Sequence, residues 1–140
     1  MPTQPRPDQI KALMEKAPEG ELYMLNLLKF KEKAEYADGR KTDLSGAEAY
    51  GLYGQAVGEI IERMGGRAVF SGIPNVMVIG DGEPEWDAVA IIAYPNIEAF
   101  RNMTASQEYQ EAHVHREAGL AHQLLINCLS QEQVGAILGG

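Results

Sequence analysis

The stretch WDAVAIIAYPNIEAFRNMTASQEYQEAHVHREAGL, residues 86–120, decides the fold. Its first part, 86–94, is an almost unbroken apolar run between turn signals, and its length and its valine and isoleucine content favour a strand. The odd-numbered positions 89–93 and the even-numbered positions 88–94 would lie on opposite faces of that strand. Because both sets are apolar, we expect both faces of the sheet to be covered.

Two short helices are predicted after the strand. Pro95 ends the strand, and Asn96 can cap a helix that begins at Ile97. A second helical piece starts at Ser106 and stops at Gly119, a residue suited to a helix C-terminus.

One face of this second helix carries polar side chains between apolar ones. Tyr109, Ala112, His113, Arg116 and Leu120 follow the spacing i, i+3, i+4, i+7, i+11. A face of this composition is partly buried and partly polar, which is typical of the wall of a binding site.

The rest of the chain supplies further elements in a recognisable order. The predicted elements are a helix at 7–16, strands at 22–30 and 67–72, a polar loop at 31–44, a helix at 45–64, extended structure at 75–79 and a strand at 121–129. This gives a βαββαβ core at 22–129 behind an N-terminal extension, 1–20, with a tail at 130–140, all in a single domain, 1–140. The order predicts an α+β, ferredoxin-like fold: an antiparallel sheet with two helices on one face.

Two local features carry further expectations. Gly51, Gly54 and Gly58 each cost about 1 kcal/mol of helix propensity against alanine, so we expect close packing at these positions. The proline-rich segment 1–6 is expected to be mobile, and the loop 31–44 is either a solvated loop or a lid.

Composition narrows the classes of partner and compartment. The chain has 140 residues and a formal net charge of −8, which argues against nucleic acid or an anionic membrane as the partner. Cys128 is the single cysteine, so no intramolecular disulfide can form; we expect this strand thiol to be buried and inert in a reducing compartment. No signal peptide or membrane span is evident, so the expected location is cytoplasmic.

The two-faced strands predict self-association. Two helices cover one face of a ferredoxin-like sheet, and an uncovered apolar face would be a large adhesive patch. A two-fold homodimer whose sheets face one another would close a barrel across the interface. Because Ala88 and Ala90 are small, we expect space inside this barrel, and that space is the predicted pocket.

Four separated motifs resemble one family in order and spacing. They are MLNLLKFK at 24–31, GGRAVFSG at 65–72, WDAVAIIAYPNIEAF at 86–100 and SQEYQEAHVHREAGLAHQLLI at 106–126. They resemble a bacterial family known as domain of unknown function 1330, with Asn96 where serine is expected. The resemblance implies a dimeric α+β barrel, a superfamily that includes cofactor-free monooxygenases, haem-degrading enzymes and muconolactone isomerase-like proteins. The family supplies no catalytic residues.

The candidate site combines the polar helix face with a polar strand residue. Arg116 would hold a carboxylate or enolate, His113 would act as a general base, and Asn26 would polarise the ligand. Further binding candidates are Tyr53, Trp86, Tyr94 and Tyr109. Structural alternatives stay open: Arg116 pairs with Glu111 or Glu117, His113 caps a buried carbonyl, and Asn26 bonds a neighbouring loop.

The motifs contain no metal or cofactor signature. His113 and His115 lie about 200° apart on a helix, so one ion cannot bind both, and there is no phosphate-binding glycine pattern. We therefore expect no metal and no cofactor. The sequence predicts a small-molecule-binding protein, either a cofactor-independent enzyme, monooxygenase- or isomerase-like, for an apolar or aromatic acid, or a non-catalytic homodimeric binding or structural protein.

Overall fold

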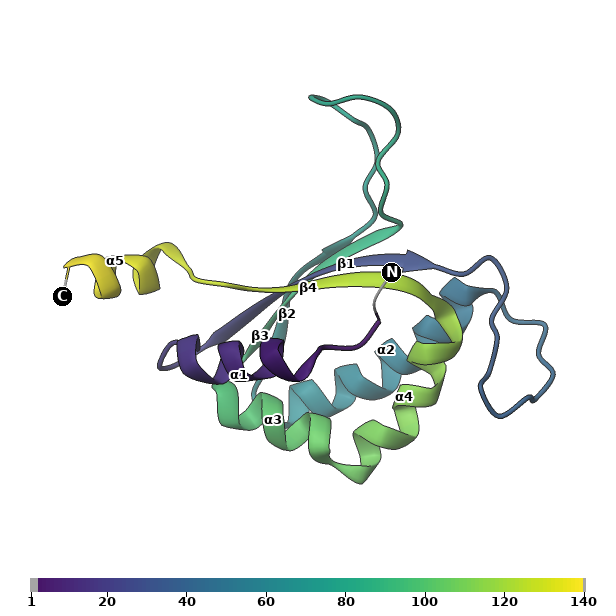
Figure 1. The fold of residues 1–140 in the computed structure, drawn as a ribbon, viewed down its shortest axis with the longest axis horizontal. Coiled ribbons are helices and arrows are strands. Elements are labelled where there is room, and N and C mark those ends of the chain that lie inside the picture. Colours follow the sequence, from purple (N-terminus) through teal and green to yellow (C-terminus); the bar gives the residue numbers. More distant parts are fainter. Residues whose placement is uncertain (1–2, 140) are drawn as a thin grey trace.

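The computed structural model describes residues 3–139 and has two main layers, a sheet with helices beneath one face (Figure 1). The four strands are antiparallel, in the order β2-β3-β1-β4. The strands are β1 (Leu22–Phe30), β2 (Arg67–Gly72), β3 (Ala88–Tyr94) and β4 (Leu120–Cys128). The helices are α1 (Pro7–Lys16), α2 (Gly46–Arg63), α3 (Ile97–Ala105), α4 (Gln107–Gly119) and α5 (Gln131–Gly139). The predicted ferredoxin-like α+β fold is confirmed.

Side-chain caps set the helix starts where the sequence predicts them. At α2, the Ser45 side chain accepts a hydrogen bond from the Glu48 amide, and the Glu48 carboxylate accepts one from the Ser45 amide. The Asn96 side chain accepts from the Ala99 amide at the start of α3. Each cap satisfies backbone donors that the first turn leaves without partners.

The main core lies between the even-numbered residues of β1 and the helix layer. Leu22 and Met24 of β1 are buried against Ile60 and Ile61 of α2. In the β1–β3 register, Asn26 stands opposite Ala90 and therefore shares this helix-facing side. Ala88 shares it too, so the expectation that small alanines leave space on the open side of the sheet is wrong.

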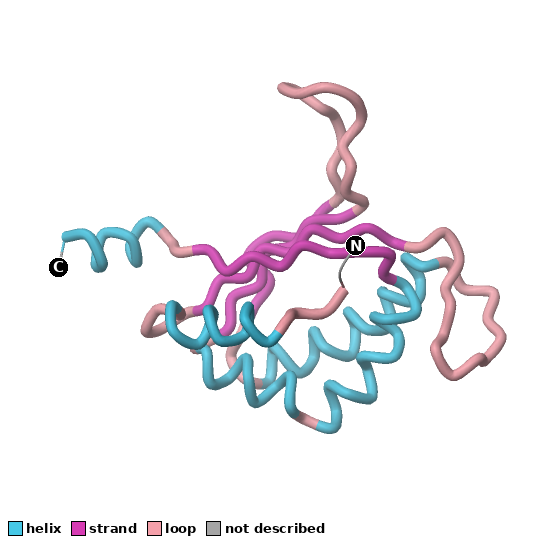
Figure 2. Tube along the Cα trace, viewed as in Figure 1, coloured by secondary structure: helices cyan, strands magenta, loops and turns pink. Residues whose placement is uncertain are grey.

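The other side of the sheet is apolar, and in the single chain it is open. Phe70 of β2 is 56% exposed, and Leu124 and Ile126 of β4 are 38% and 43% exposed. The registers place Leu25 and Leu27 of β1 opposite Ile126 and Leu124, on the same side. In Figure 2, helices α1–α4 lie beneath the opposite face, and α5 projects beyond the end of β4.

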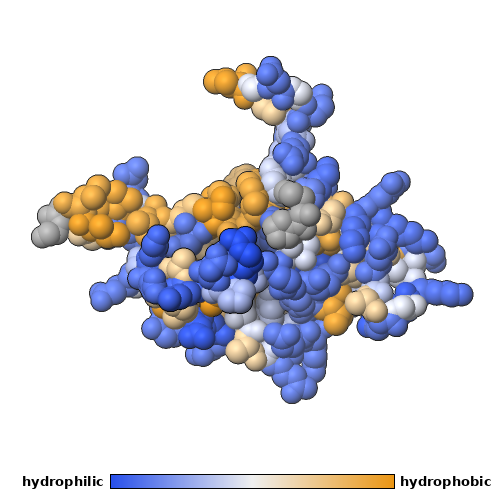
Figure 3. Space-filling model, viewed as in Figure 1, coloured by the Kyte–Doolittle hydropathy of each residue, from blue (hydrophilic) through white to orange (hydrophobic). Residues whose placement is uncertain are grey.

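The connection between β2 and β3 forms an arm, residues 73–87, that extends away from the body on the open side of the sheet (Figure 2). The sequence allowed the extended segment 75–79 to continue the strand 67–72 past a bulge or to form a second short strand, and it forms neither. Ile73, Val78 and Ile79 are 79%, 87% and 92% exposed. Figure 3 shows apolar surface at the arm, over α5 and along the sheet next to it.

Close backbone packing occurs at glycines other than those expected. A Cβ on Gly119 would lie 2.3 Å from the Gly46 carbonyl oxygen, so α4 ends directly against the start of α2. A Cβ on Gly51, Gly54 or Gly58 would meet nothing within 4 Å. The close packing predicted for these three helix positions is therefore wrong.

The N-terminal extension packs on the helix side of the sheet. Leu13 and Ala17 contact the core cluster, although no residue of α1 is buried. Within the segment 1–6 that is expected to be mobile, Thr3 and Gln4 form hydrogen bonds to α4, and Met1 and Pro2 lie outside the described residues. Within residues 3–139, no helix is both long and apolar enough to cross a membrane.

Candidate functional site

Arg116 is the most buried charged residue of α4 and lies between the helix layer and the sheet. Only 8% of the residue is exposed. One terminal nitrogen, Nη1, donates to the Glu117 carboxylate at 3.0 Å, while Nη2 donates to the Gln123 side-chain carbonyl and to the Thr3 backbone carbonyl, the latter at 2.6 Å. The guanidinium is therefore fixed from two sides, as a buried cation requires.

Two amide side chains continue this network into the sheet. The Gln123 amide nitrogen on β4 donates to the Asn26 side-chain carbonyl on β1 at 2.9 Å. The Asn26 nitrogen in turn donates to the backbone carbonyls of Met24 and Ala90, at 3.2 and 3.4 Å. Each amide accepts on the side of Arg116 and donates away from it, so the aligned dipoles stabilise the positive charge. Asn26 thus bonds neighbouring strands, and not the loop that the structural alternative named.

His113 lies one helical turn before Arg116 and is 22% exposed. The Gln4 amide nitrogen lies 3.2 Å from His113 Nε2 and also donates to the Glu117 carboxylate. The Gln4 contact favours the tautomer in which Nε2 accepts and Nδ1 carries the proton, whereas the Glu117 carboxylate oxygen, 3.5 Å from Nε2, favours the other tautomer. The buried-carbonyl cap proposed as the alternative role of His113 is not formed, whereas the Arg116–Glu117 pair is.

Burial and charge both favour neutral His113. Desolvation lowers the pKa of the imidazole, the nearby Arg116 guanidinium lowers it further, and the Glu117 carboxylate opposes these effects in part. A neutral imidazole is the form that a general base needs, and in this structure its Nε2 is in contact with the Gln4 amide.

A tyrosine cluster forms the adjoining wall between α2 and α4. The hydroxyls of Tyr53 and Tyr109 lie 3.0 Å apart, and the rings of Tyr50 and Tyr53 lie 5.1 Å apart, centroid to centroid. Burial raises the pKa of Tyr50 to about 12, and burial followed by the proximity of Tyr109 raises the pKa of Tyr53. These phenols therefore stay protonated and available as donors at neutral pH.

Two predicted binding residues lie apart from the Arg116 network. The Tyr94 ring packs edge-on against Phe100, 4.9 Å between centroids, within the core, and burial raises the pKa of its phenol. Trp86 packs edge-on against His122, 5.3 Å between centroids. Neither side chain forms a hydrogen bond with Arg116 or His113 in the described part of the chain. Tyr94 belongs to the core beneath the tyrosine cluster, and Trp86 precedes β3.

The main correction to the predicted site concerns the face of the sheet on which its polar residues lie. Asn26 and Gln123 point toward the helices, on the side where Arg116 lies, and not toward the open face that would line a barrel. The pocket predicted inside the barrel therefore does not contain the predicted polar residues. Cys128 does belong to the open side, opposite Tyr23, and is half-buried, so its expected full burial is wrong.

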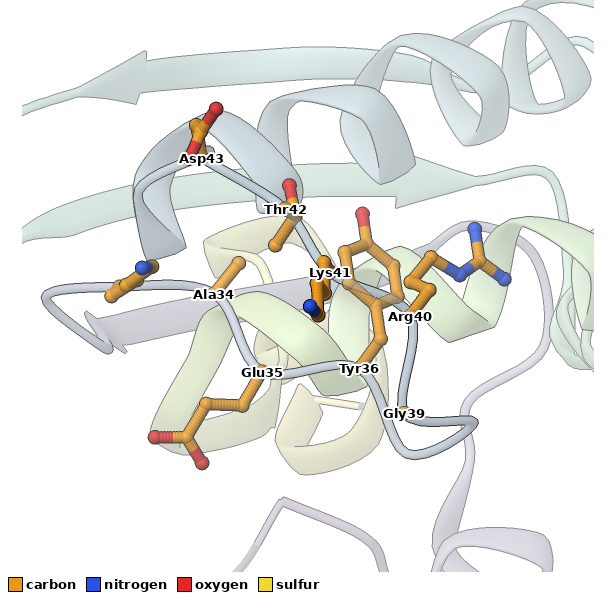
Figure 4. A pocket seen from close by; sticks show the side chains of 9 residues that line it. Ala34, Glu35, Tyr36, Gly39, Arg40, Lys41, Thr42 and Asp43 are labelled. Carbon is orange, nitrogen blue, oxygen red and sulfur yellow. The ribbon is translucent and has the colours of Figure 1, made fainter.

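The loop after β1 contains a separate hollow of about 700 Å³ (Figure 4). Its walls come from the loop itself, residues 33–43, and Tyr36 and Arg40 stack across one side, with the guanidinium carbon 4.5 Å from the ring centroid. The Tyr36 hydroxyl also lies 2.7 Å from Nδ1 of His115. The hollow includes none of the predicted site residues. Within residues 3–139, no three His, Cys, Asp or Glu side chains are grouped to hold a metal.

Acidification should destabilise the fold through His113 and His115. Burial lowers both pKa values, with added lowering from Arg116 at His113 and from Arg40 at His115. As pH falls through about 6.5, the unfolded imidazoles take up protons before the folded ones do, so stability decreases from there down to the folded pKa values. Thermal unfolding at several pH values would measure this.

Replacement of both histidines by glutamine provides the matched comparison. In the double variant, the unfolding temperature should lose most of its pH dependence between about pH 7 and pH 5, a range in which carboxylates contribute little. An unchanged slope would show that these imidazoles are not responsible.

Several residues of this network escaped prediction. Gln123 is a polar residue within the apolar run AHQLLINCL, the same signal that identified Asn26, and it is the link between Asn26 and Arg116. Tyr50 precedes Tyr53 by three residues, nearly one helical turn, and shares its cluster. The contacts of Thr3 and Gln4 carry no sequence signal, because one of them uses a backbone oxygen.

Solved structures similar to this chain include proteins from a bacterium and a plant. The first is the RPA0582 protein of unknown function from Rhodopseudomonas palustris, at 35% identity and a TM-score of 0.79, covering 89% of this chain and 93% of that one. The second is At3g17210 from Arabidopsis thaliana, at 18% identity and a TM-score of 0.52, covering 79% of this chain and 95% of that one; it shares the fold alone. No curated protein matches the chain.

A family model also matches residues 40–127, well over half of the chain, and its description is Domain of unknown function (DUF1330). The match spans α2, the arm and α4 and extends through most of β4, so it includes Arg116 and Gln123. The chain therefore belongs to the DUF1330 family.

Proposed function

We propose that this protein binds a small apolar or aromatic molecule through a carboxylate or carbonyl oxygen at Arg116. The observation that supports this most is how the guanidinium is held: Glu117 and Gln123 orient it, while its remaining partner is a carbonyl oxygen from the N-terminal segment. An oriented, desolvated donor of this kind is suited to an oxygen ligand. The tyrosine cluster would contact the apolar part of the molecule.

We further propose a cofactor-independent proton transfer, an isomerase-like reaction, with His113 as the base. Nε2 of neutral His113 would take a proton from the carbon next to the ligand carbonyl, and the electron pair of that C–H bond would move to the carbonyl oxygen. Arg116 would stabilise the resulting enolate, as oriented donors do for developing oxyanions. Return of the proton to another carbon of the conjugated system completes the isomerisation, so no oxidant or reductant is needed.

A non-catalytic role is the second candidate, and one observation favours it. Arg116, Gln123 and Asn26 are joined by hydrogen bonds, and Arg116 is also paired with Glu117 within the single chain. A buried cation satisfied in this way can serve the fold or simple ligand binding without chemistry.

Hydrogen exchange on a bound ligand separates these two functions. Aromatic and lactone metabolites would first be screened by thermal shift, and each molecule that binds would be incubated with the protein in D2O. We expect deuterium to enter the ligand in the presence of the wild-type protein. The His113→Gln variant should bind the ligand equally well, but the rate of deuterium exchange should fall at least about a hundredfold. Binding without exchange in the wild type would favour the non-catalytic function, and the absence of any binding would contradict both.

We propose a homodimer as the functional form. The exposed apolar side chains of the open face, together with Ile73 and Ile79 of the arm, form a surface larger than monomers usually leave uncovered. Because the arm extends from that same side of the sheet, a second copy packed on the open face would cover both (Figure 2). A symmetric pair buries the same patch on each copy and leaves the helix-side site of each chain intact.

A further inference from the structure

The side chains that would bind the ligand are already occupied by the N-terminus of the same chain. Residues 3–6, here called the N-terminal strap, lie beside α4 on the helix side of the sheet (Figure 1). The Thr3 backbone carbonyl accepts a hydrogen bond from Arg116. The Gln4 side-chain amide donates to Glu117 and contacts Nε2 of His113. His113, Arg116 and Glu117 of this helix therefore each have a strap residue as a partner.

The strap can leave without opening the core. Helix α1, which follows it, has no buried residue, and its Ile10 and Met14 remain 44% and 38% exposed. Leu13 and Ala17 hold α1 against the core from positions well past the strap. Arg6 pairs with the exposed carboxylate of Asp8, so that contact also does not depend on α4. Segments held by a few partly exposed hydrogen bonds open with small free energies.

The strap also indicates the chemistry that the site accepts. It presents an uncharged carbonyl oxygen to the guanidinium and an uncharged N–H donor to the Glu117 carboxylate and to His113 Nε2. Because Glu117 already neutralises Arg116 through Nη1, at 3.0 Å, a carboxylate ligand at Nη2 would meet a second negative charge on the same guanidinium. A neutral carbonyl with a neighbouring N–H group satisfies every partner in this cluster.

We propose that the strap is a built-in occupant of the site and that the molecule displacing it is an uncharged amide on an apolar or aromatic body. This inference rests on the proposed ligand site and adds its ligand class and its regulation. A seated strap and a bound ligand exclude one another, so the apparent affinity is the intrinsic affinity multiplied by the fraction of molecules in which the strap is released.

The test compares benzamide with benzoate as probes in NMR titrations of the full-length protein. Three proteins are needed: wild type, Gln4→Ala, which removes the amide contacts with Glu117 and His113, and Lys11→Ala, an exposed change on α1 as the matched control. We expect Gln4→Ala to bind benzamide about tenfold more tightly than wild type, and Lys11→Ala to match wild type. Benzamide binding to the wild type should shift the backbone resonances of residues 3–6 to random-coil positions, and benzoate should bind more weakly in all three.

Each contrary result would overturn one specific part of this proposal, either the role of the strap or the class of ligand. Equal benzamide affinity in wild type and Gln4→Ala, with unmoved strap resonances, would show that the strap is not an occupant, while ligand binding would stand. Tighter binding of benzoate than benzamide would overturn the ligand class. Binding of neither probe to any of the three proteins would also overturn the class, and the metabolite screen would decide on the proposed function separately.

Discussion

Gly119→Ala is expected to lower the free energy of unfolding by about 4 kcal/mol or more, the range reserved for severe packing defects. The added Cβ would lie 2.3 Å from the Gly46 carbonyl oxygen and 2.9 Å from the Tyr50 amide nitrogen. Both are backbone atoms, so neither can rotate away, and the ends of α2 and α4 must separate. These two helices carry the tyrosine cluster and Arg116, so any folded protein that remains should also lose the 3.0 Å contact between Tyr53 and Tyr109.

Gly58→Ala is the matched control, since it makes the same chemical change within α2. Its Cβ would meet nothing within 4 Å, so alanine should stabilise the helix by up to about 1 kcal/mol. Chemical denaturation of the three proteins measures both effects. Similar stabilities for Gly119→Ala and wild type would show that α2 and α4 have room for a Cβ between Gly46 and Gly119.

Ile126→Lys is expected to convert the proposed homodimer into single subunits. Ile126 is 43% exposed on the edge strand β4, opposite Leu25, on the open apolar face. In a symmetric interface the lysine enters twice, and burying two unpaired charges should weaken association on the order of a thousandfold. Sedimentation at micromolar concentration should give twice the 15.3 kDa chain mass for wild type and 15.3 kDa for the variant.

Leu52→Lys controls for surface charge alone. Leu52 is 43% exposed on α2, away from the open face, so this variant should remain dimeric. A wild-type protein that sediments as one subunit would contradict the proposed dimer, and it would leave the exposed arm without an explanation.

Elements with strong local signals were predictable. The spacing of Tyr109, His113 and Arg116 predicted that they share one face of α4, because helix geometry determines which residues lie on the same face. The capping box at Ser45 similarly fixed the start of α2. Both signals lie within a few residues of one another in the sequence.

The location of the site was not predictable in the same way. β3 is apolar on both faces, so its pattern does not tell which side meets the helices, and Ala88 and Ala90 were assigned to the wrong one. The polar residues Asn26 and Gln123 mark the correct side, but only the strand register joins them to Arg116. The close approach of Gly46 and Gly119 and the strap contacts of Thr3 depend on residues far apart in the chain, for which no local pattern exists.

The central claim is that ligand binds on the helix side of the sheet, at Arg116. A crystal structure with the best molecule from the metabolite screen tests it most directly. We expect the ligand oxygen within hydrogen-bonding distance of Arg116 Nη2, where the Thr3 carbonyl oxygen now lies 2.6 Å away. A ligand held between the open sheet faces of two copies, with the bond between Arg116 and Thr3 intact, would contradict the claim.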